Sequence, residues 1–362
     1  MRFVSTGAGP DRVITEFSKV FVMGSDAVGF GTVSSITLAS DQNSICVSTS
    51  RGFAVYQTSD FSLTYSHSHD CPVLYAESVA SSSLILLLTD CRVTLWSCSD
   101  NKAVASIDFE AAANVNAVRS NSRRVMASLA NDRILFFELK SLRVLSSLEE
   151  SATAISLAGG SEHGYAAWGK KDGSVTIVDS YTLGKVGSVA AHSSPISAVA
   201  LSPMGNFLAT ASERGTVVRV FNLPKFELFA LFRRGTSEAR LTSLCFSAGA
   251  AGNEFFLCAA GDLETAHIFK HAGETPSPRW PVLGKILPAA ARNLLEATRA
   301  AALVRLRCEP SDANLVAVIG KGVVVVSKGG FAFTYDLASE CKLKHEFSLL
   351  TNLSSYSIFF SM

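Results

Sequence analysis

The sequence predicts an all-β protein, a single seven-bladed β-propeller over residues 1–362 with one long inserted loop and helix in its sixth blade. Three observations lead to this fold class. A pattern of short apolar strands and polar turns recurs along the whole chain. Most copies are spaced by about 40 residues, the length of a four-stranded propeller blade. One step is longer than this period by about twenty residues, which indicates the insertion.

The repeated unit contains three recognisable strands. The clearest copy has an alternating strand at 195–202, a short and very apolar strand at 206–212, and a strand at 215–221 that ends in an aromatic residue. Successive copies begin near Ser35, Val73, Val115, Thr153, Pro195, Leu241 and Leu303. Closing these copies into a ring would leave only short and protected strand edges.

Two parts of the chain fit the repeat less well. The second copy, at 74–96, is degenerate, so a ring of fewer than seven blades remains an alternative. Residues 1–30 precede the first clear copy, and we expect them to contribute a strand that closes the last blade. Turns rich in Gly, Ser, Asn and Asp nevertheless favour the all-β class along the chain.

The insertion lies between Leu241 and Leu303, the expected starts of the last two copies. Residues 273–279 contain glycine and two prolines and predict a loop. Residues 284–301 predict an amphipathic helix. Its apolar face would carry Leu287, Ala291, Leu294, Thr298 and Ala301, and its polar face Lys285, Arg292, Glu296 and Arg299.

We expect the inserted segment, 271–301, to face a membrane, since a long insertion in a tight repeat is usually functional. Alanines bury little apolar surface, so the membrane-inserting residues would be Leu287, Leu294 and Leu295. The alternative is that the helix packs flat against the propeller.

Composition limits the function classes. Hydrophobic residues make up 48% of the chain, charged residues 17%, and the formal net charge is +1. A chain of this length can bury a large core. Because there is no global basic field, we expect no nucleic acid among the partners. Any site for an anion must therefore come from local charge.

Cysteine usage and the apolar runs bear on the compartment. The eight cysteines are scattered, and no two have the C-x2-C spacing of a zinc site. We therefore expect buried thiols in a reducing compartment, with no metal and no cofactor. Residues 1–11 lack the apolar core of a secretory signal, and the runs at 84–88 and 322–326 are too short to cross a bilayer. These features predict a cytoplasmic protein.

Local positive charge is concentrated after the fifth copy. Residues 192–240 contain six Lys or Arg against three Glu, and two arginines, Arg233 and Arg234, are adjacent. Neighbouring residues on a strand point to opposite sides, so this pair could serve two pockets. Each guanidinium offers a rigid donor fork that matches phosphate oxygens. The alternative is that both arginines pair with acidic residues of a neighbouring blade.

The run Phe232-Arg-Arg-Gly235 resembles the F/L-R-R-G signature of the PROPPINs, WD-repeat-like β-propellers that bind polyphosphoinositides and include the WIPI autophagy proteins. The segments at 191–196, 209–221, 264–269 and 340–350 are also similar to segments of that family. The likeness covers roughly residues 35–350 and is best between 192 and 269.

The resemblance implies two headgroup sites built from arginines, hydroxyls and imidazoles. The first would use His192, Ser212, Thr216, Arg219 and Arg233, and the second Arg234, Thr236, Thr265 and His267. Ala260 and Gly261 stand where the family usually has small hydroxyl residues, so the second site would have fewer donors. Taken alone, His192 would be a structural turn residue and His267 a strand residue facing solvent.

The resemblance also implies a function. We expect a peripheral membrane adaptor that binds phosphatidylinositol 3-phosphate, the 3,5-bisphosphate or both, in autophagosome formation or endosomal traffic. Membranes containing phosphoinositides would recruit it, and autophagy proteins would bind other blade faces. The alternative is a generic WD-repeat scaffold for protein interactions without lipid binding. We expect no enzyme, because the sequence has no nucleophile elbow, P-loop or histidine–carboxylate metal motif.

Overall fold

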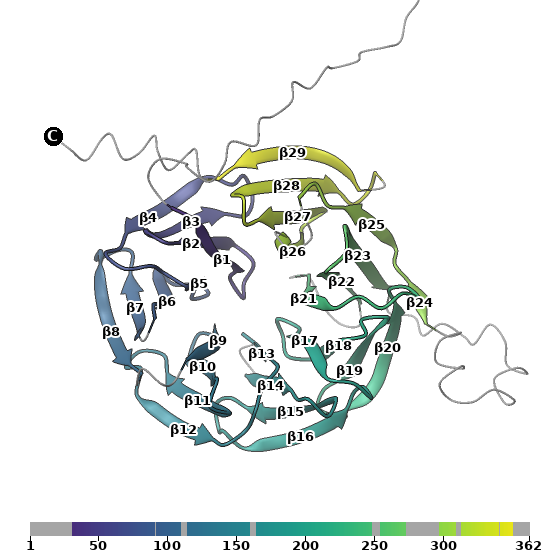
Figure 1. The fold of residues 1–362 in the computed structure, drawn as a ribbon, viewed down its shortest axis with the longest axis horizontal. Helices are drawn as coiled ribbons and strands as arrows, with labels where there is room; N and C mark the ends of the chain where they lie inside the picture. The colour runs from purple at the N-terminus through teal and green to yellow at the C-terminus, as the bar shows by residue number, and fades with distance from the viewer. Residues whose placement is uncertain are drawn as a thin grey trace, which may run out of the picture.

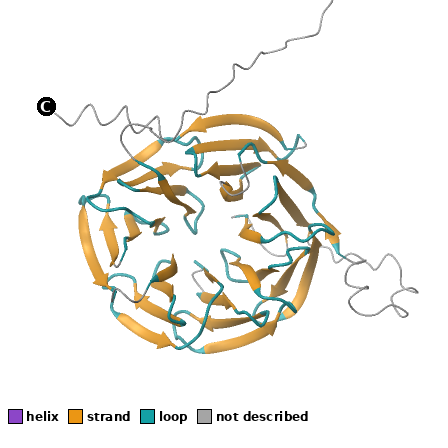
Figure 2. Ribbon diagram, viewed as in Figure 1, coloured by secondary structure: helices purple, strands orange, loops and turns teal. Residues whose placement is uncertain are grey.

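Seven sheets stand in a ring around a central axis (Figure 1). This is a computed structural model, and it describes residues 31–90, 92–109, 114–159, 164–247, 254–272, 297–308, 313–339 and 341–349. Throughout these ranges the regular structure is strand, without a helix (Figure 2). The predicted all-β, seven-bladed propeller is therefore confirmed.

Each blade contains four antiparallel strands that run in sequence order from the inside of the ring to its rim. The first four blades comprise β1 (Val33–Leu38), β2 (Ser44–Thr49), β3 (Gly52–Gln57) and β4 (Leu63–Ser68); β5 (Tyr75–Ser78), β6 (Leu84–Leu88), β7 (Arg92–Ser97) and β8 (Lys102–Asp108); β9 (Val115–Ser120), β10 (Arg124–Leu129), β11 (Arg133–Glu138) and β12 (Val144–Leu148); and β13 (Ala154–Leu157), β14 (Tyr165–Gly169), β15 (Ser174–Asp179) and β16 (Lys185–Ala190).

The fifth blade differs from the others because a fifth strand joins its outer edge. The last three blades comprise β17 (Ile196–Leu201), β18 (Phe207–Ser212), β19 (Val217–Asn222), β20 (Glu227–Arg233) and the added β24 (Thr298–Arg299); β21 (Leu241–Phe246), β22 (Glu254–Gly261), β23 (Thr265–Ala272) and β25 (Ala302–Arg305); and β26 (Ala313–Ile319), β27 (Gly322–Ser327), β28 (Phe331–Asp336) and β29 (Lys342–Ser348).

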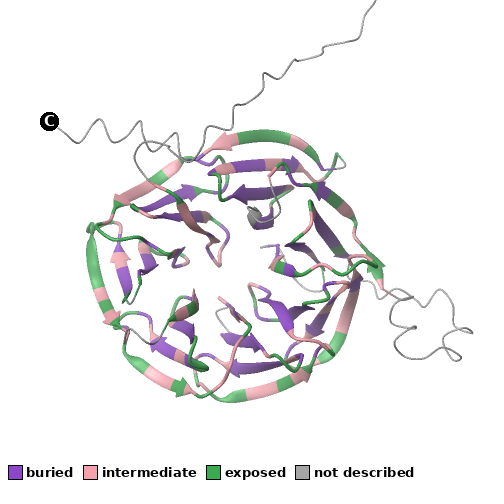
Figure 3. Cartoon of the chain, in the orientation of Figure 1, coloured by how far each residue is buried: buried purple, intermediate pink, exposed green. Residues whose placement is uncertain are grey.

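Burial follows the position of a strand within its blade (Figure 3). Every residue of β17 and β18 is buried, because neighbouring blades cover both faces of these inner strands. The rim strand β8 instead contains only exposed and half-buried residues. This difference explains why the inner and middle strands are richer in apolar and small residues than the outer strands.

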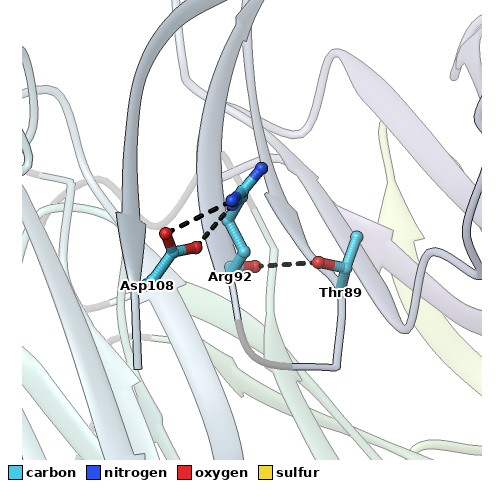
Figure 4. Close-up of polar contacts among 3 residues, drawn as sticks. All are labelled: Thr89, Arg92 and Asp108. Atoms are coloured by element: carbon cyan, nitrogen blue, oxygen red, sulfur yellow. Dashed lines mark hydrogen bonds and ion pairs between the residues drawn. The ribbon is translucent and has the colours of Figure 1, made fainter. Parts of the chain in front are cut away.

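The degenerate second copy forms a complete blade. Arg92 and Asp108 are paired in register across β7 and β8. The Arg92 guanidinium donates to both carboxylate oxygens of Asp108, with Nε–Oδ1 and Nη2–Oδ2 distances of 2.5 and 3.2 Å (Figure 4). At the turn before β7, the carbonyl of Arg92 accepts the backbone N–H of Thr89 at 2.9 Å. The Thr89 hydroxyl donates to the same carbonyl at 3.4 Å (Figure 4). These contacts fix the third and fourth strands of the blade, so the alternative of a smaller ring is wrong.

The ring closes where the seventh blade packs against the first. Ile36 and Val47 of blade 1 share a buried cluster with Val324 and Val326 of blade 7. The Tyr56 hydroxyl also donates to the carbonyl of Leu349 at 2.6 Å. All four strands of the last blade come from 313–348, and the strand expected from residues 1–30 lies outside the described residues.

Two expectations about the last part of the chain are wrong. Leu303 lies in β25, the outer strand of blade 6, and the seventh blade begins at β26. The helix expected over 284–301 does not extend to its end, because Thr298 and Arg299 form β24. The insertion nevertheless falls in the sixth blade, between β23 and β25.

The remainder of the insertion, 273–296, lies outside the described residues, and with it Leu287, Leu294 and Leu295. In the part of the chain that the structure does describe, no helix is long and apolar enough to cross a membrane.

Candidate anion-binding site on blades 5 and 6

A buried aromatic residue anchors the arginine pair. Phe232, next to the end of β20, is only 1% exposed and stacks on Phe269 of blade 6, with ring centroids 4.8 Å apart. Arg233 is the last residue of β20, and Arg234 begins the turn that follows. Both arginines are only half-buried. The packing of Phe232 between two blades therefore places them at the blade 5–blade 6 junction.

The backbone holds Arg234 in place. Its backbone N–H donates to the carbonyl of Thr216 at 2.9 Å, and its Nε donates to the carbonyl of Gly215 at 2.8 Å. Its Nη2 also donates to the carbonyl of Ser237. None of these acceptors is a carboxylate, and the Nη1 donors have no protein partner in the described ranges. Arg234 is thus oriented but not neutralised.

Gly215 makes this arrangement possible. Its φ of +55° lies in the left-handed region, and a Cβ added there would lie 1.8 Å from the carbonyl oxygen of Ala239. Any other residue would therefore strain the backbone and clash with the chain that follows β20. A glycine is required where the carbonyl of this turn approaches Arg234.

A hollow of about 320 Å³ lies beside the two arginines. Residues of blades 5 and 6 line it, together with β24, which Figure 1 shows at the rim between β20 and β25. The lining consists of Arg233, Arg234, Gly235, Thr236, His267, Arg299, Ala300 and Leu303. It contains three guanidiniums and no carboxylate. Such a surface is suited to an anion.

Gly235 leaves part of this lining open. A Cβ added to Gly235 would meet no atom within 4 Å. The glycine of the Phe-Arg-Arg-Gly run is thus not required by the packing of the protein itself. The absence of a side chain leaves the backbone open at this point of the hollow.

His267 lines the hollow as a neutral ring. Its side chain is 7% exposed, and its buried Nδ1 has no partner among the described residues. Burial, and secondarily the positive charge of Arg234, lowers the pKa of His267 to about 4. At neutral pH the ring therefore adds no charge to the hollow. It was expected to face solvent if it had only a structural role, and that alternative is wrong.

Arg219 and His192 form a separate, internally bonded group on blades 4 and 5. Nη1 of Arg219 donates to Nδ1 of His192 at 2.8 Å and to the carbonyl of Ala191 at 3.0 Å. Nε2 of His192 lies 3.0 Å from the hydroxyl oxygen of Thr210. Burial, followed by the charge of Arg219, lowers the pKa of His192 to about 4. The ring is thus neutral and orients Arg219.

The first predicted site is only partly assembled. In the pairing of blade 5, Arg219 lies opposite Thr210, and Arg233 lies opposite Val217. Residues two apart on a strand share a face, so Ser212, Arg219 and Arg233 belong to the same face of the sheet. Arg233 nevertheless lines the hollow together with Arg234. Both arginines thus reach this hollow, while Arg234 alone of the pair also borders the narrow crevice beside Thr265.

Two predicted residues lie next to the hollow without lining it. Thr216 precedes β19, and its carbonyl accepts the backbone N–H of Arg234. Thr265, the first residue of β23, lies in a narrow crevice with Arg234, Arg240 and Asp262. Of the second predicted site, the hollow thus brings together Arg234, Thr236 and His267.

The structure also explains why hydroxyls are absent at 260 and 261. Ala260 is 2% exposed and belongs to the core between blades 6 and 7. A Cβ at Gly261 would lie 2.0 Å from the carbonyl oxygen of Arg240. Neither position can present a hydroxyl to the hollow without rearranging the backbone or the core.

Nearby arginines differ in whether they are neutralised. Arg214 pairs with Glu238 at 2.8 Å, and Arg305 pairs with Glu264 at 3.6 Å, both on the surface. Within the described ranges, no carboxylate lies within ion-pair distance of an arginine that lines the hollow. The alternative that Arg233 and Arg234 pair with acids of a neighbouring blade therefore finds no support.

Two residues of this region were missed by the sequence analysis. Thr210, which is fully buried, contacts the ring of His192, and its position opposite Arg219 follows from the strand pairing of blade 5. Arg299 was assigned to a helix, and only its parallel pairing with Arg233 brings it to the hollow.

Comparisons with known proteins agree with this fold. Autophagy-related protein 18 of Aspergillus clavatus is 26% identical over 272 residues, which cover 67% of this chain and 63% of that protein. WD repeat domain phosphoinositide-interacting protein 1 of Xenopus laevis is 26% identical over 357 residues, covering 90% and 81%. The chain thus matches less than two thirds of the length of the fungal relative and more of the frog relative.

Solved structures share the propeller. Kluyveromyces lactis Hsv2 superposes with a TM-score of 0.69 at 18% identity, over 88% of this chain and 99% of that chain. A complex of KlAtg21 with the coiled coil of AgAtg16 gives a TM-score of 0.70 at 18% identity, with the same coverage. The sequence matches the PROPPIN family over residues 32–342. Because this match covers most of the chain, the protein belongs to the PROPPIN family.

Proposed function

We propose that this protein binds the phosphorylated headgroups of inositol lipids and acts as a peripheral, non-enzymatic adaptor in autophagosome formation or endosomal traffic. One observation carries the proposal: the hollow at the blade 5–blade 6 junction is lined by three guanidiniums and no carboxylate. Arginine forks match phosphate oxygens, and arginines without a carboxylate partner in one concave place favour an anionic ligand.

The lipid source of the phosphate is supported by the relatives. The frog relative is named as a phosphoinositide-interacting protein, and the fungal relative as an autophagy-related protein. We propose phosphatidylinositol 3-phosphate, the 3,5-bisphosphate or both as ligands. Arg233, Arg234, Thr236 and His267 would contact the headgroup in the hollow, and Thr265 would lie at its margin.

The first predicted site has a different part in this proposal. Arg219 is held by His192 through its Nη1 only, so its Nε and Nη2 donors are left for a second phosphate. We propose Ser212 and Thr216 as hydroxyl donors beside it. His192 would act on a headgroup there indirectly, by orienting Arg219.

Two further parts of the chain would contact a protein partner and the membrane. KlAtg21 has been solved with the coiled coil of AgAtg16, and we propose that a partner of this kind binds other blade faces of the present chain. We further propose that the inserted segment, 271–301, contacts the membrane through Leu287, Leu294 and Leu295. Deleting residues 273–296 should then weaken binding to vesicles but not to a soluble headgroup.

Vesicle flotation tests the function. Wild-type protein should float with vesicles that contain phosphatidylinositol 3-phosphate or the 3,5-bisphosphate and not with vesicles of phosphatidylcholine alone. The double variant Arg233→Thr/Arg234→Thr should remain in the bottom fraction of the gradient. The double variant Arg214→Thr/Arg305→Thr removes the same charge from ion-paired surface arginines and should float like wild type. A wild-type protein that ignores phosphoinositides would instead support the protein-only scaffold.

A further inference from the structure

The end of the insertion, residues 297–301, is called its returning arm. Its strand β24 brings Arg299 to the arginine pair. Thr298 and Arg299 pair in parallel with Phe232 and Arg233 of β20. This pairing joins two segments that are far apart in the sequence, and it makes blade 5 the one described sheet with a fifth strand. The next residues are also fixed, since the N–H of Ala301 donates to the carbonyl of Ile268 at 2.8 Å. Arg299 is therefore held from both sides of the junction.

Arg299 shares the hollow with the arginine pair, and its exposed side chain has no carboxylate within ion-pair distance in the described part of the chain. Arg305, six residues later, is instead paired with Glu264. Three like charges around about 320 Å³ repel one another when the hollow contains only water. The arrangement becomes favourable when a multiply charged anion lies among them.

We propose that Arg299 is a third phosphate-binding arginine of the hollow, and that the β20–β24 pairing is the device that positions it. This proposal rests on the proposed function and adds a residue to it. It assigns to the returning arm of the insertion a direct part in headgroup binding, independent of any contact with acyl chains. A third guanidinium favours headgroups with more phosphate charge, so its contribution is larger for a bisphosphorylated lipid than for a monophosphorylated one.

The test compares two single variants that each remove one positive charge from the described segment 297–308, one from β24 and one from β25. Arg299→Gln removes a cation that lines the hollow, whereas Arg305→Gln removes an exposed cation outside it. The ligands are soluble inositol 1,3-bisphosphate and inositol 1,3,5-trisphosphate, which are the headgroups of the two lipids, and inorganic phosphate as the non-lipid source. Affinity is measured by isothermal titration calorimetry.

We expect Arg299→Gln to weaken binding of the trisphosphate by about ten- to hundred-fold, and that of the bisphosphate by less, because one charge-assisted contact is lost. Arg305→Gln should stay within about two- to three-fold of wild type, since an exposed charge contributes little. Inorganic phosphate should bind far more weakly to all three proteins. Tight binding of inorganic phosphate, lost in Arg299→Gln, would confirm the third arginine but name free phosphate as its ligand.

The melting temperature shows whether each variant is folded and whether the three arginines of the hollow repel one another. Without ligand, Arg299→Gln should melt at the same temperature as wild type or higher, because one of three mutually repelling charges is gone. With the trisphosphate, its melting temperature should rise less than that of wild type. A second variant, Thr298→Pro, keeps Arg299 but disfavours the strand pairing, and it should lose a similar factor in affinity.

The outcomes separate the two proposals. If wild type binds no inositol phosphate, the proposed function fails. If wild type binds and Arg299→Gln binds equally well, or loses no more than Arg305→Gln, then Arg299 is not a ligand and only the present inference fails. Wild-type affinity in Thr298→Pro would overturn the positioning role of β24.

Discussion

Nη1 of Arg219 donates a hydrogen bond of 2.8 Å to Nδ1 of His192. An arginine can only donate, so Nδ1 must accept, and the proton of the neutral ring lies on Nε2. That Nε2–H then donates to the Thr210 hydroxyl, which in turn lies 3.4 Å from the carbonyl of Arg219. The family resemblance places this histidine at the first headgroup site. In the structure both of its ring nitrogens belong to a chain of hydrogen bonds that orients Arg219.

Thr210 should therefore matter for stability. Thr210→Val removes the acceptor of the His192 Nε2–H inside a fully buried position, and an unsatisfied buried donor costs about 1–3 kcal/mol. We expect the free energy of unfolding in urea to fall by this amount. Thr210→Ser keeps the hydroxyl and should lose less, so equal losses in the two variants would show that the methyl group and not the hydrogen bond matters.

Stability should also depend on pH through His192 and His267. Burial lowers the pKa of each to about 4 from the ordinary value of 6.5. Between these values the unfolded chain binds more protons than the folded one, so folding stability decreases as the pH falls from 6.5 towards 4. Urea midpoints at a series of pH values measure this slope.

The double variant His192→Gln/His267→Gln should flatten that dependence. The same pKa values keep both rings neutral between about pH 7.5 and 6, so headgroup binding in this range should not follow histidine titration. The contrary result is a wild-type affinity that rises strongly as the pH falls over this range, with no such rise in the double variant. The rings would then be charged at a higher pH than their burial implies.

Two glycines of the site should respond oppositely to alanine. Gly215→Ala forces a Cβ to 1.8 Å from the carbonyl of Ala239 at a φ of +55°, and we expect a loss of at least about 2 kcal/mol in unfolding free energy. Gly235→Ala meets no atom within 4 Å and should change stability little. Thermal denaturation of both variants gives the comparison. A Gly215→Ala protein as stable as wild type would contradict the claim that only glycine fits beside the carbonyl of Ala239.

Filling the hollow should abolish binding without unfolding the protein. Gly235→Leu adds a large side chain at a residue that lines the hollow and has open space around its Cβ position. We expect headgroup affinity to fall by at least about ten-fold, equivalent to ~1.4 kcal/mol, at an unchanged melting temperature. Retained affinity in this variant would mean that the ligand does not enter the hollow.

Much of the fold could be predicted because a blade is a local unit. Its four strands are consecutive in sequence, so the repeat in the apolar pattern reveals them even where a copy such as that of β5–β8 is degenerate. The boundary of the last blade could not be placed in this way. The insertion separates β25 from β23, and the strand at Leu303 therefore resembled the start of a new copy.

The site was less predictable than the fold. The arginine pair is visible in the sequence, and the strand pairing opposite Arg219 makes Thr210 a neighbour that the pattern could have suggested. Arg299 could not have been found, because its position depends on a parallel contact between β24 and β20 that no local period encodes. Nor does the pattern reveal that Arg233 and Arg234 line one hollow, since this depends on how blades 5 and 6 meet.

The central claim is that the hollow beside Arg233 and Arg234 binds a phosphorylated inositol headgroup. Calorimetric titration of soluble inositol 1,3-bisphosphate into the wild type and into Arg233→Thr/Arg234→Thr tests it most directly. Each lost charge-assisted contact is worth roughly 1.5–3 kcal/mol, so the double variant should bind at least about a hundred-fold more weakly. Equal affinity in the two proteins, with the variant shown to be folded by circular dichroism, would contradict the account.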